Sequence, residues 1–155
     1  MYSTLLHLAR NIFFYKNIKL KDTFETRLYL MLFHFSLILI IFKYKKQKFN
    51  QNFYDSLFNH IENDLRESGL GDVTVNKKMK DINKILYDIL LKINISKTKN
   101  SLILNDHLIK SYFKELNNEK SHNYKEFCRY FLLFFNFCFE LPKDIMLREL
   151  KNFKF

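Results

Sequence analysis

The feature that most constrains this chain is an apolar segment near its start, RLYLMLFHFSLILIIFK. Between Arg27 and Lys43 lie 15 residues without a charge, which span about 22 Å as an α-helix. A bilayer core is about 30 Å thick, and runs of this length are more often buried inside proteins. A helix that is apolar on all sides must also be covered on all sides. We therefore expect a buried central helix over about residues 22–45, with His34 as a core histidine that has a local hydrogen-bond partner.

The remaining chain supplies helices to cover that segment. Two glycines and one proline provide too few turn residues for a β-sandwich or barrel. Apolar spacing and capping residues predict further helices over 3–15, 49–68, 74–94, 103–117, 122–140 and a short one that begins at Pro142. The sequence thus predicts an all-α, single-domain bundle of about six to seven helices over residues 1–155.

Helix starts and cysteines add detail. Asp22 with Glu25 three residues later resembles a capping box at the start of the central helix. Cys128 and Cys138 lie ten residues apart, about 15 Å along one helix, which is too far for a disulfide. They are interpreted as buried, small apolar residues of a reducing compartment.

Both glycines lie in RESGLGDVTV, residues 66–75. If a helix ends just before Gly69, this residue occupies the position that usually adopts a left-handed conformation. Gly71 then permits a second unusual dihedral angle, and Asp72 or Thr74 caps the next helix. The segment predicts a tight, glycine-containing αα-hairpin.

The charges beside this hairpin oppose the helix dipoles, with acids at a C-terminus and lysines at an N-terminus. One interpretation is that acids and lysines pair across the hairpin. The other is that the charged tip is kept for a partner. The candidate partner-binding residues are Asp64, Arg66, Glu67, Gly69, Gly71, Asp72, Lys77 and Lys78.

The net charge of +10 is concentrated in the first third, where residues 1–50 hold nine lysines and arginines against two acids. A basic surplus favours acidic proteins, nucleic acid or anionic lipid as partners. The cluster KYKKQK is a candidate membrane-facing surface, because juxtamembrane lysines are attracted to anionic lipid. Its alternative is a solvated loop. The lysines concerned are Lys43, Lys45, Lys46 and Lys48.

No pattern points to catalysis, a metal or a cofactor. The five histidines have no metal-ligand spacing. His60 and Asp64, four residues apart, are interpreted as a helix-stabilising surface pair. The GLG tripeptide lacks the lysine and hydroxyl residues of a phosphate-binding loop. We therefore expect a non-enzymatic protein without a cofactor.

The segment FYDSLFNHIENDLRESGLGDVTVNKKMKDINKILY, residues 53–87, resembles the signature of the ubiquinol–cytochrome c chaperone family. The matching pieces are the acidic IENDLRE, the hairpin SGLGD, the lysine pair NKK and the LY of the following helix. ARNIFFYKN, RLYLMLFHFSLIL and KNFKF are similar to the opening helix, central helix and closing tail of that family. Asp88 departs from it, because a small residue is expected after Tyr87.

The resemblance implies an assembly chaperone for respiratory complex III that binds newly made cytochrome b, together with a small co-chaperone. Family members in mitochondria do so near the ribosomal tunnel exit. The sequence shows no signal or transit peptide, so we expect a bacterial member in the cytoplasm, peripheral at the inner membrane, with no DNA partner.

Two other functions stay open. A basic RNA- or ribosome-binding module would place lysines and exposed aromatic residues on one continuous face, whereas a protein client favours a basic end beside an apolar groove. A lipid- or quinone-binding bundle would need an open internal cavity.

Overall fold

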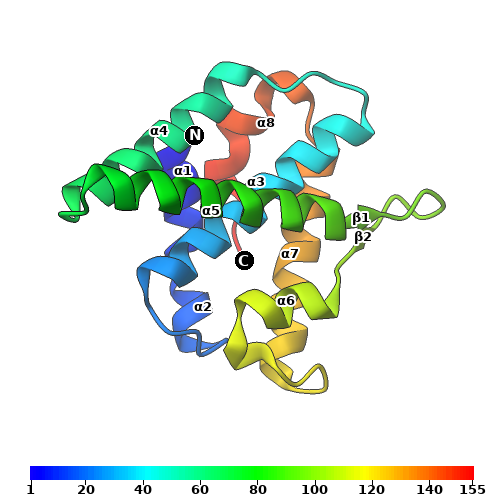
Figure 1. Cartoon of the computed structure of the whole chain (residues 1–155). Helices are drawn as coiled ribbons and strands as arrows, with labels where there is room; N and C mark the ends of the chain where they lie inside the picture. The colour runs from blue at the N-terminus through cyan, green and yellow to red at the C-terminus, as the bar shows by residue number, and fades with distance from the viewer.

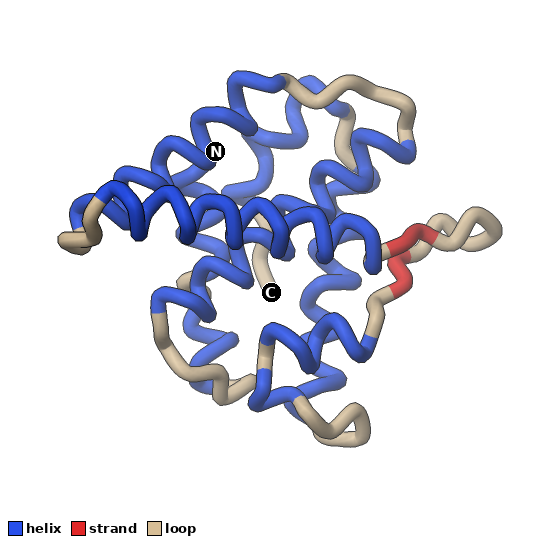
Figure 2. Tube along the Cα trace, in the orientation of Figure 1, coloured by secondary structure: helices blue, strands red, loops and turns tan.

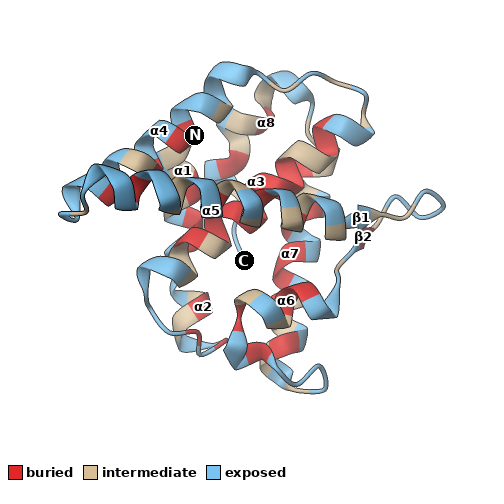
Figure 3. Cartoon of the chain, in the orientation of Figure 1, coloured by how far each residue is buried: buried red, intermediate tan, exposed pale blue.

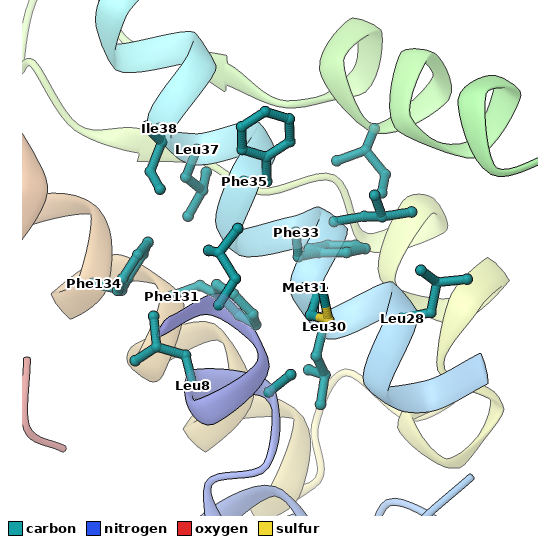
Figure 4. Packing of buried hydrophobic residues seen from close by; sticks show 14 of the residues in the cluster. Leu8, Leu28, Leu30, Met31, Phe33, Phe35, Leu37, Ile38, Phe131 and Phe134 are labelled. Carbon is teal, nitrogen blue, oxygen red and sulfur yellow. The ribbon is translucent and has the colours of Figure 1, made fainter. Parts of the chain in front are cut away.

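Helix α3, Phe24–Tyr44, is the centre of the structure, a computed structural model that describes residues 1–155. Twelve of its 21 residues are buried. Their side chains leave the helix on several sides, with Leu8 of α1 and Phe131 and Phe134 of α7 beside them (Figure 4). Although α3 is long and apolar enough to cross a membrane, it is covered by the rest of the chain. The predicted buried central helix is confirmed.

The other helices pack around α3 (Figure 1). Helix α3 is in direct contact with α1, α5 and α7. Nearly all of the chain outside the loops is helical (Figure 2). The predicted all-α bundle is therefore confirmed. Its remaining elements are α1 Tyr2–Ala9, α2 Ile12–Lys16, α4 Gln51–Glu67, α5 Asp72–Lys92, β1 Asn94–Ile95, β2 Leu102–Ile103, α6 Asp106–Tyr112, η1 Lys114–Leu116, α7 His122–Glu140, α8 Lys143–Glu149 and η2 Leu150–Asn152.

Aromatic rings fill much of the core between α2, α3 and α7. Phe14, Phe33, Phe127 and Phe131 are fully buried, and the ring centroids of Phe127 and Phe131 lie 4.9 Å apart. Aromatic pairs at such distances stabilise a core beyond the area they bury. These rings belong to one hydrophobic cluster of 39 buried residues, so the interior is packed with side chains.

His34 is the polar centre of this core, and it has the local partner that the sequence predicts. Its Nδ1 lies 2.6 Å from the carbonyl oxygen of Leu30, and its Nε2 lies 3.0 Å from the hydroxyl of Tyr130. Because a carbonyl can only accept, Nδ1 carries the proton and Nε2 accepts from Tyr130. Complete burial lowers the pKa of His34 to about 4, so the ring is neutral near pH 7.

The N-terminal segment differs from the single helix predicted over 3–15. The chain turns at Arg10, and Asn11 begins α2 by accepting a hydrogen bond from the backbone N–H of Phe13 at 3.0 Å. Two helices result because an asparagine side chain competes well for the free N–H groups of a new helix start. The continuous apolar stripe concealed this break.

The start of α3 also differs from the predicted capping box. Thr23, and not Asp22, is the N-cap, and its hydroxyl accepts from the backbone N–H of Thr26 at 3.1 Å. Asp22 instead pairs with Arg27 at 2.8 Å. The helix begins one position later than the pattern indicated because either residue type can act as a cap.

The region between α5 and α7 was the least well predicted. The polar break NISKTKNS is the tip of a short antiparallel hairpin in which Asn94 pairs with Ile103 and Ile95 with Leu102. The helix expected over 103–117 is shorter, Asp106–Tyr112, and is followed by a 3₁₀ turn. Asn105 caps it by accepting from the N–H of Leu108 at 3.0 Å, which fixes the later start.

Candidate functional site: the hairpin tip and the ends of α5

The predicted αα-hairpin between α4 and α5 is confirmed, and Gly69 makes its turn. Helix α4 ends at Glu67, and Gly69 follows with φ +89°. Its N–H donates to the carbonyl oxygen of Arg66 at 3.0 Å, which is one of the two bonds of a Schellman motif. Only glycine adopts this left-handed backbone conformation without a steric penalty, because it has no Cβ atom.

Gly71 does not have the unusual dihedral angle that the sequence predicted. With φ −69° and ψ 159° it is in extended backbone that any residue can adopt, and it is the N-cap of α5. A Cβ atom at this position would meet nothing within 4 Å. Neither Asp72 nor Thr74 is the cap, because α5 already begins at Asp72. One glycine is therefore needed by the turn and the other is not.

Arg66 ties the two helices of the hairpin together. Its Nη2 lies 2.7 Å from Glu62 Oε1 one turn earlier in α4, and its Nη1 pairs with Asp72 in the first turn of α5. Asp72 at this position also faces the positive end of the α5 dipole. Two acids near the tip, Glu62 and Asp72, thus pair with Arg66, and none of the acids there pairs with a lysine, so the predicted pairing of acids with lysines is wrong.

Asp64 faces away from the lysines, into a cleft against the start of the chain. It accepts a hydrogen bond from the hydroxyl of Tyr2, whose ring stacks on His60 at a centroid distance of 4.8 Å. Burial and the neighbouring Asp64 carboxylate raise the pKa of Tyr2, so the phenol keeps the proton that it donates. The predicted His60–Asp64 pair is replaced by contacts of both residues with Tyr2. Arg10 and Arg27 also line this cleft.

The lysines of the tip form no ion pair. Lys77 and Lys80 are exposed and Lys78 is half-buried, and none of the eight salt bridges of the chain involves them. Glu67 is likewise exposed and unpaired. The structure therefore divides the predicted site into an internally paired group around Arg66 and a row of lysines along α5 that faces solvent.

Of the four lysines at the end of α3 and just after it, one has a structural role. Lys45 Nζ donates to the carbonyl oxygens of Phe139 and Leu141 at 2.5 and 3.1 Å, at the end of α7. The ammonium group also lies 5.0 Å from the centre of the Phe139 ring. A lysine at a helix C-terminus satisfies carbonyls that have no partner inside the helix. Lys43, Lys46 and Lys48 are exposed.

An apolar groove lies at the opposite end of α5 from the hairpin tip, beside β1. It has a volume of about 470 Å³. Its walls come from the end of α3, the end of α5 and the first strand, and two lysines are among its lining residues. The lining residues are Leu39, Ile40, Lys43, Tyr44, Leu90, Ile93, Asn94, Ile95 and Lys97.

Several residues of these surfaces could not be found from the sequence. Tyr2 reaches Asp64 across 62 positions, and Arg10 joins the same cleft only because the chain turns beside it. The groove is formed partly by the strand β1, which the sequence did not indicate.

The sequence model for the family described as "Ubiquinol-cytochrome C chaperone" matches residues 16–146. The match contains the central helix, the hairpin and the groove. A search among curated proteins and a search among solved structures each find no match.

Proposed function

The chain belongs to the ubiquinol–cytochrome c chaperone family, and we propose that it holds newly made cytochrome b for assembly into complex III. Because the chain belongs to this family, it has a role in the assembly of complex III. The family match over most of the chain is the observation that carries the proposal. Cytochrome b as the client is the finer step, which the resemblance of residues 53–87 supports.

The protein acts in this proposal by binding and without catalysis. Apart from Asp64, which lines the cleft beside Tyr2, the charged residues of the hairpin tip lie on an exposed turn rather than in a cleft of the kind that acid–base catalysis uses. Lys77 and Lys78 supply unpaired positive charge for the partner. The paired group around Arg66 holds the turn in shape.

The groove beside β1 favours a protein client over RNA. An apolar groove that is also lined by Lys43 and Lys97 suits an apolar segment with acidic residues beside it. RNA binding would require several exposed aromatic rings among the lysines, whereas most aromatic residues here are in the core and Tyr87 is the one exposed ring in the lysine row of α5. The packed interior likewise gives a quinone or lipid no enclosed chamber of the kind that the alternative requires.

The test is deletion of the gene in its host, followed by measurement of complex III and of haem-loaded cytochrome b. We expect both to fall and to recover with the wild-type gene. The variant K77E/K78E should fail to restore them while its circular dichroism and melting curve stay unchanged. A variant with the same charge change elsewhere, K120E/K125E, should restore them. Normal levels of complex III in the deletion strain would remove the proposed function.

A location at the inner face of the membrane, in the cytoplasm, is also part of the proposal. Lys43, Lys46 and Lys48 would contact anionic lipid, with about 1 kcal/mol for each lysine near the surface. Lys45 is excluded because its charge is held at the end of α7. Co-sedimentation with phosphatidylglycerol vesicles should fall steeply with salt. Absence of binding at low salt would refute the membrane contact and leave the assembly role intact.

A further inference from the structure

The side of α5 that faces away from the core carries a row of residues spaced three or four positions apart, which places them on one helical face. Helix α5 crosses the front of the molecule in Figure 1, and its outward side is exposed along its length in Figure 3. We call this row the outer face of α5. Its members are Val73, Lys77, Lys80, Lys84, Tyr87 and Leu91.

The lysines of the outer face repel one another. Lys77 and Lys80 are three residues apart and Lys80 and Lys84 are four apart, spacings at which like charges destabilise a helix. The nearest ion pair is weak, with 3.9 Å between Lys84 Nζ and an oxygen of Asp81. An isolated α5 would gain stability from glutamate at position 80, so the fold does not require this arrangement.

Apolar side chains lie at both ends of the lysine row. Val73 is 86% exposed, Tyr87 is 59% exposed and Leu91 is 80% exposed. None of them contributes to the hydrophobic cluster of the core. Tyr87 and Leu91, four residues apart on the helix, form a small exposed apolar patch at one end of the lysine row, and a partner that covers the row would remove this patch from water.

From this pattern we infer that the outer face of α5 docks an acidic helical segment of a partner protein. The distance from Val73 to Leu91 is 18 residues, about 27 Å along the helix, the length of five turns. A partner helix that lies along this face would place acids opposite Lys80 and Lys84 and apolar side chains opposite the two ends. Charge complementarity selects the acidic partner, and the apolar ends fix its register.

The same pattern fits a membrane or a nucleic acid less well. A helix that lies on a membrane separates its apolar and charged residues into different sectors. Here the apolar and charged residues lie on the same face of α5. Burial of Val73 and Leu91 in lipid would therefore also bury the charges of Lys80 and Lys84. Nucleic acid would engage the lysines and could stack a base on Tyr87, but it would leave Val73 and Leu91, which are 86% and 80% exposed, without a contact.

This inference goes beyond the proposed function, because it concerns a second partner and a surface of α5 past the hairpin tip. Lys77 belongs to both surfaces and is therefore left unchanged in the test. The test uses purified protein and a synthetic ligand, so its result does not depend on complex III.

The probe is a fluorescent 21-residue helical peptide with three glutamates at the centre of one face and leucines at both ends of that face. A second peptide carries lysine in place of each glutamate. We expect the wild-type protein to bind the acidic peptide and not the basic one. The K80E/K84E variant should bind the acidic peptide at least about tenfold more weakly than the wild type does, and it should bind the basic peptide instead. K120E/K125E, with the same net charge, should bind as the wild type does.

Two further measurements separate the apolar from the charged contribution. The Leu91→Ser variant should bind the acidic peptide more weakly than the wild type does, and its melting curve should be unchanged. Equal loss of binding in K80E/K84E and K120E/K125E would mean attraction to net charge only, and would overturn the inference. So would no binding of the acidic peptide, or vesicle binding that depends on Lys80 and Lys84 while peptide binding does not.

Discussion

Helices α3 and α5 are both 21 residues long and lie against each other, yet they contribute to the protein in different ways. In α3, 12 residues are buried, whereas α5 buries only Val75, Ile82, Leu86 and Ile89. The apolar surface of α3 is covered by the core except near its end, where Leu39 and Ile40 line the groove beside β1. The inner side of α5 is part of that cover, and its outer side faces solvent with three lysines.

This difference separates residues that hold the fold from residues that are free to bind. A substitution in α3 changes packing on every side, because protein interiors are close-packed. A substitution of Lys80, Lys84 or Leu91 on the outer face of α5 replaces an exposed side chain. The two helices therefore predict opposite outcomes for stability and for partner binding.

The largest expected effect is from Phe33→Ala in the middle of α3. Phe33 is fully buried, and its ring lies 5.3 Å from that of Phe113 and 5.7 Å from that of Phe131. Loss of the ring should lower the free energy of unfolding by about 3–5 kcal/mol, through lost burial and the cavity left behind. Urea denaturation measures it. A loss below about 1 kcal/mol would contradict the central position of α3.

The next effect is a loss of stability in acid that depends on His34. Burial lowers the pKa of His34 to about 4 in the folded protein, whereas an unfolded histidine titrates near 6.5. The unfolded state therefore binds the proton first, and the contribution of His34, complete above about pH 6.5, is lost as the pH falls toward 4. The free energy of unfolding should drop by about 3 kcal/mol over this range.

Two measurements isolate this contribution from that of the carboxylates. An NMR titration should show His34 still neutral at pH 5. His34→Phe, which retains an aromatic ring, should show a smaller decline of stability between pH 6.5 and 4. A His34 resonance that titrates near pH 6.5 would contradict the buried position.

A smaller effect distinguishes the two glycines that lead into α5. Gly69→Ala should destabilise the protein by about 1–2 kcal/mol, because φ +89° is unfavourable for an L-residue. Gly71→Ser should be neutral or stabilise by a few tenths of a kcal/mol as an N-cap. Thermal unfolding of both variants measures the difference. Equal destabilisation would mean that the turn needs both glycines.

The smallest effect is expected on the outer face of α5. Leu91→Ser should leave the free energy of unfolding within about 0.5 kcal/mol of the wild type, as exposed substitutions generally do. Urea denaturation beside Phe33→Ala makes the comparison direct. A large loss of stability would show that Leu91 packs in the fold, and the inferred partner surface would lose its apolar end.

The parts of the fold that could be predicted are those with a strong local signal. The charge-free run of α3 and the four-and-three repeat of α5 lead to helices whatever surrounds them. The break at Asn11 and the start of α6 at Asp106 could not be predicted, because capping there competes with a continuing apolar pattern. The strand β1 is only two residues long and has no periodicity to detect.

For the candidate site, the turn at Gly69 could be predicted because a left-handed residue after a helix has a sequence signature. The partners of the charges could not. Asp64 accepts a hydrogen bond from Tyr2 at the start of the chain. Arg66 forms ion pairs with Glu62 and Asp72, so these two acids are not paired with lysines. Such choices depend on how α1 and α4 pack, which the local pattern of residues 64–78 does not contain.

The contact of Lys45 with the end of α7 has a consequence for chemical labelling. An amine-reactive reagent needs a free, deprotonated amine, and this one is engaged by two carbonyl oxygens and an aromatic ring. Mild acylation of the native protein should therefore modify Lys43, Lys46 and Lys48 and spare Lys45. Its protection would report whether α3 and α7 are still docked, which makes one ordinary lysine a probe of the intact bundle.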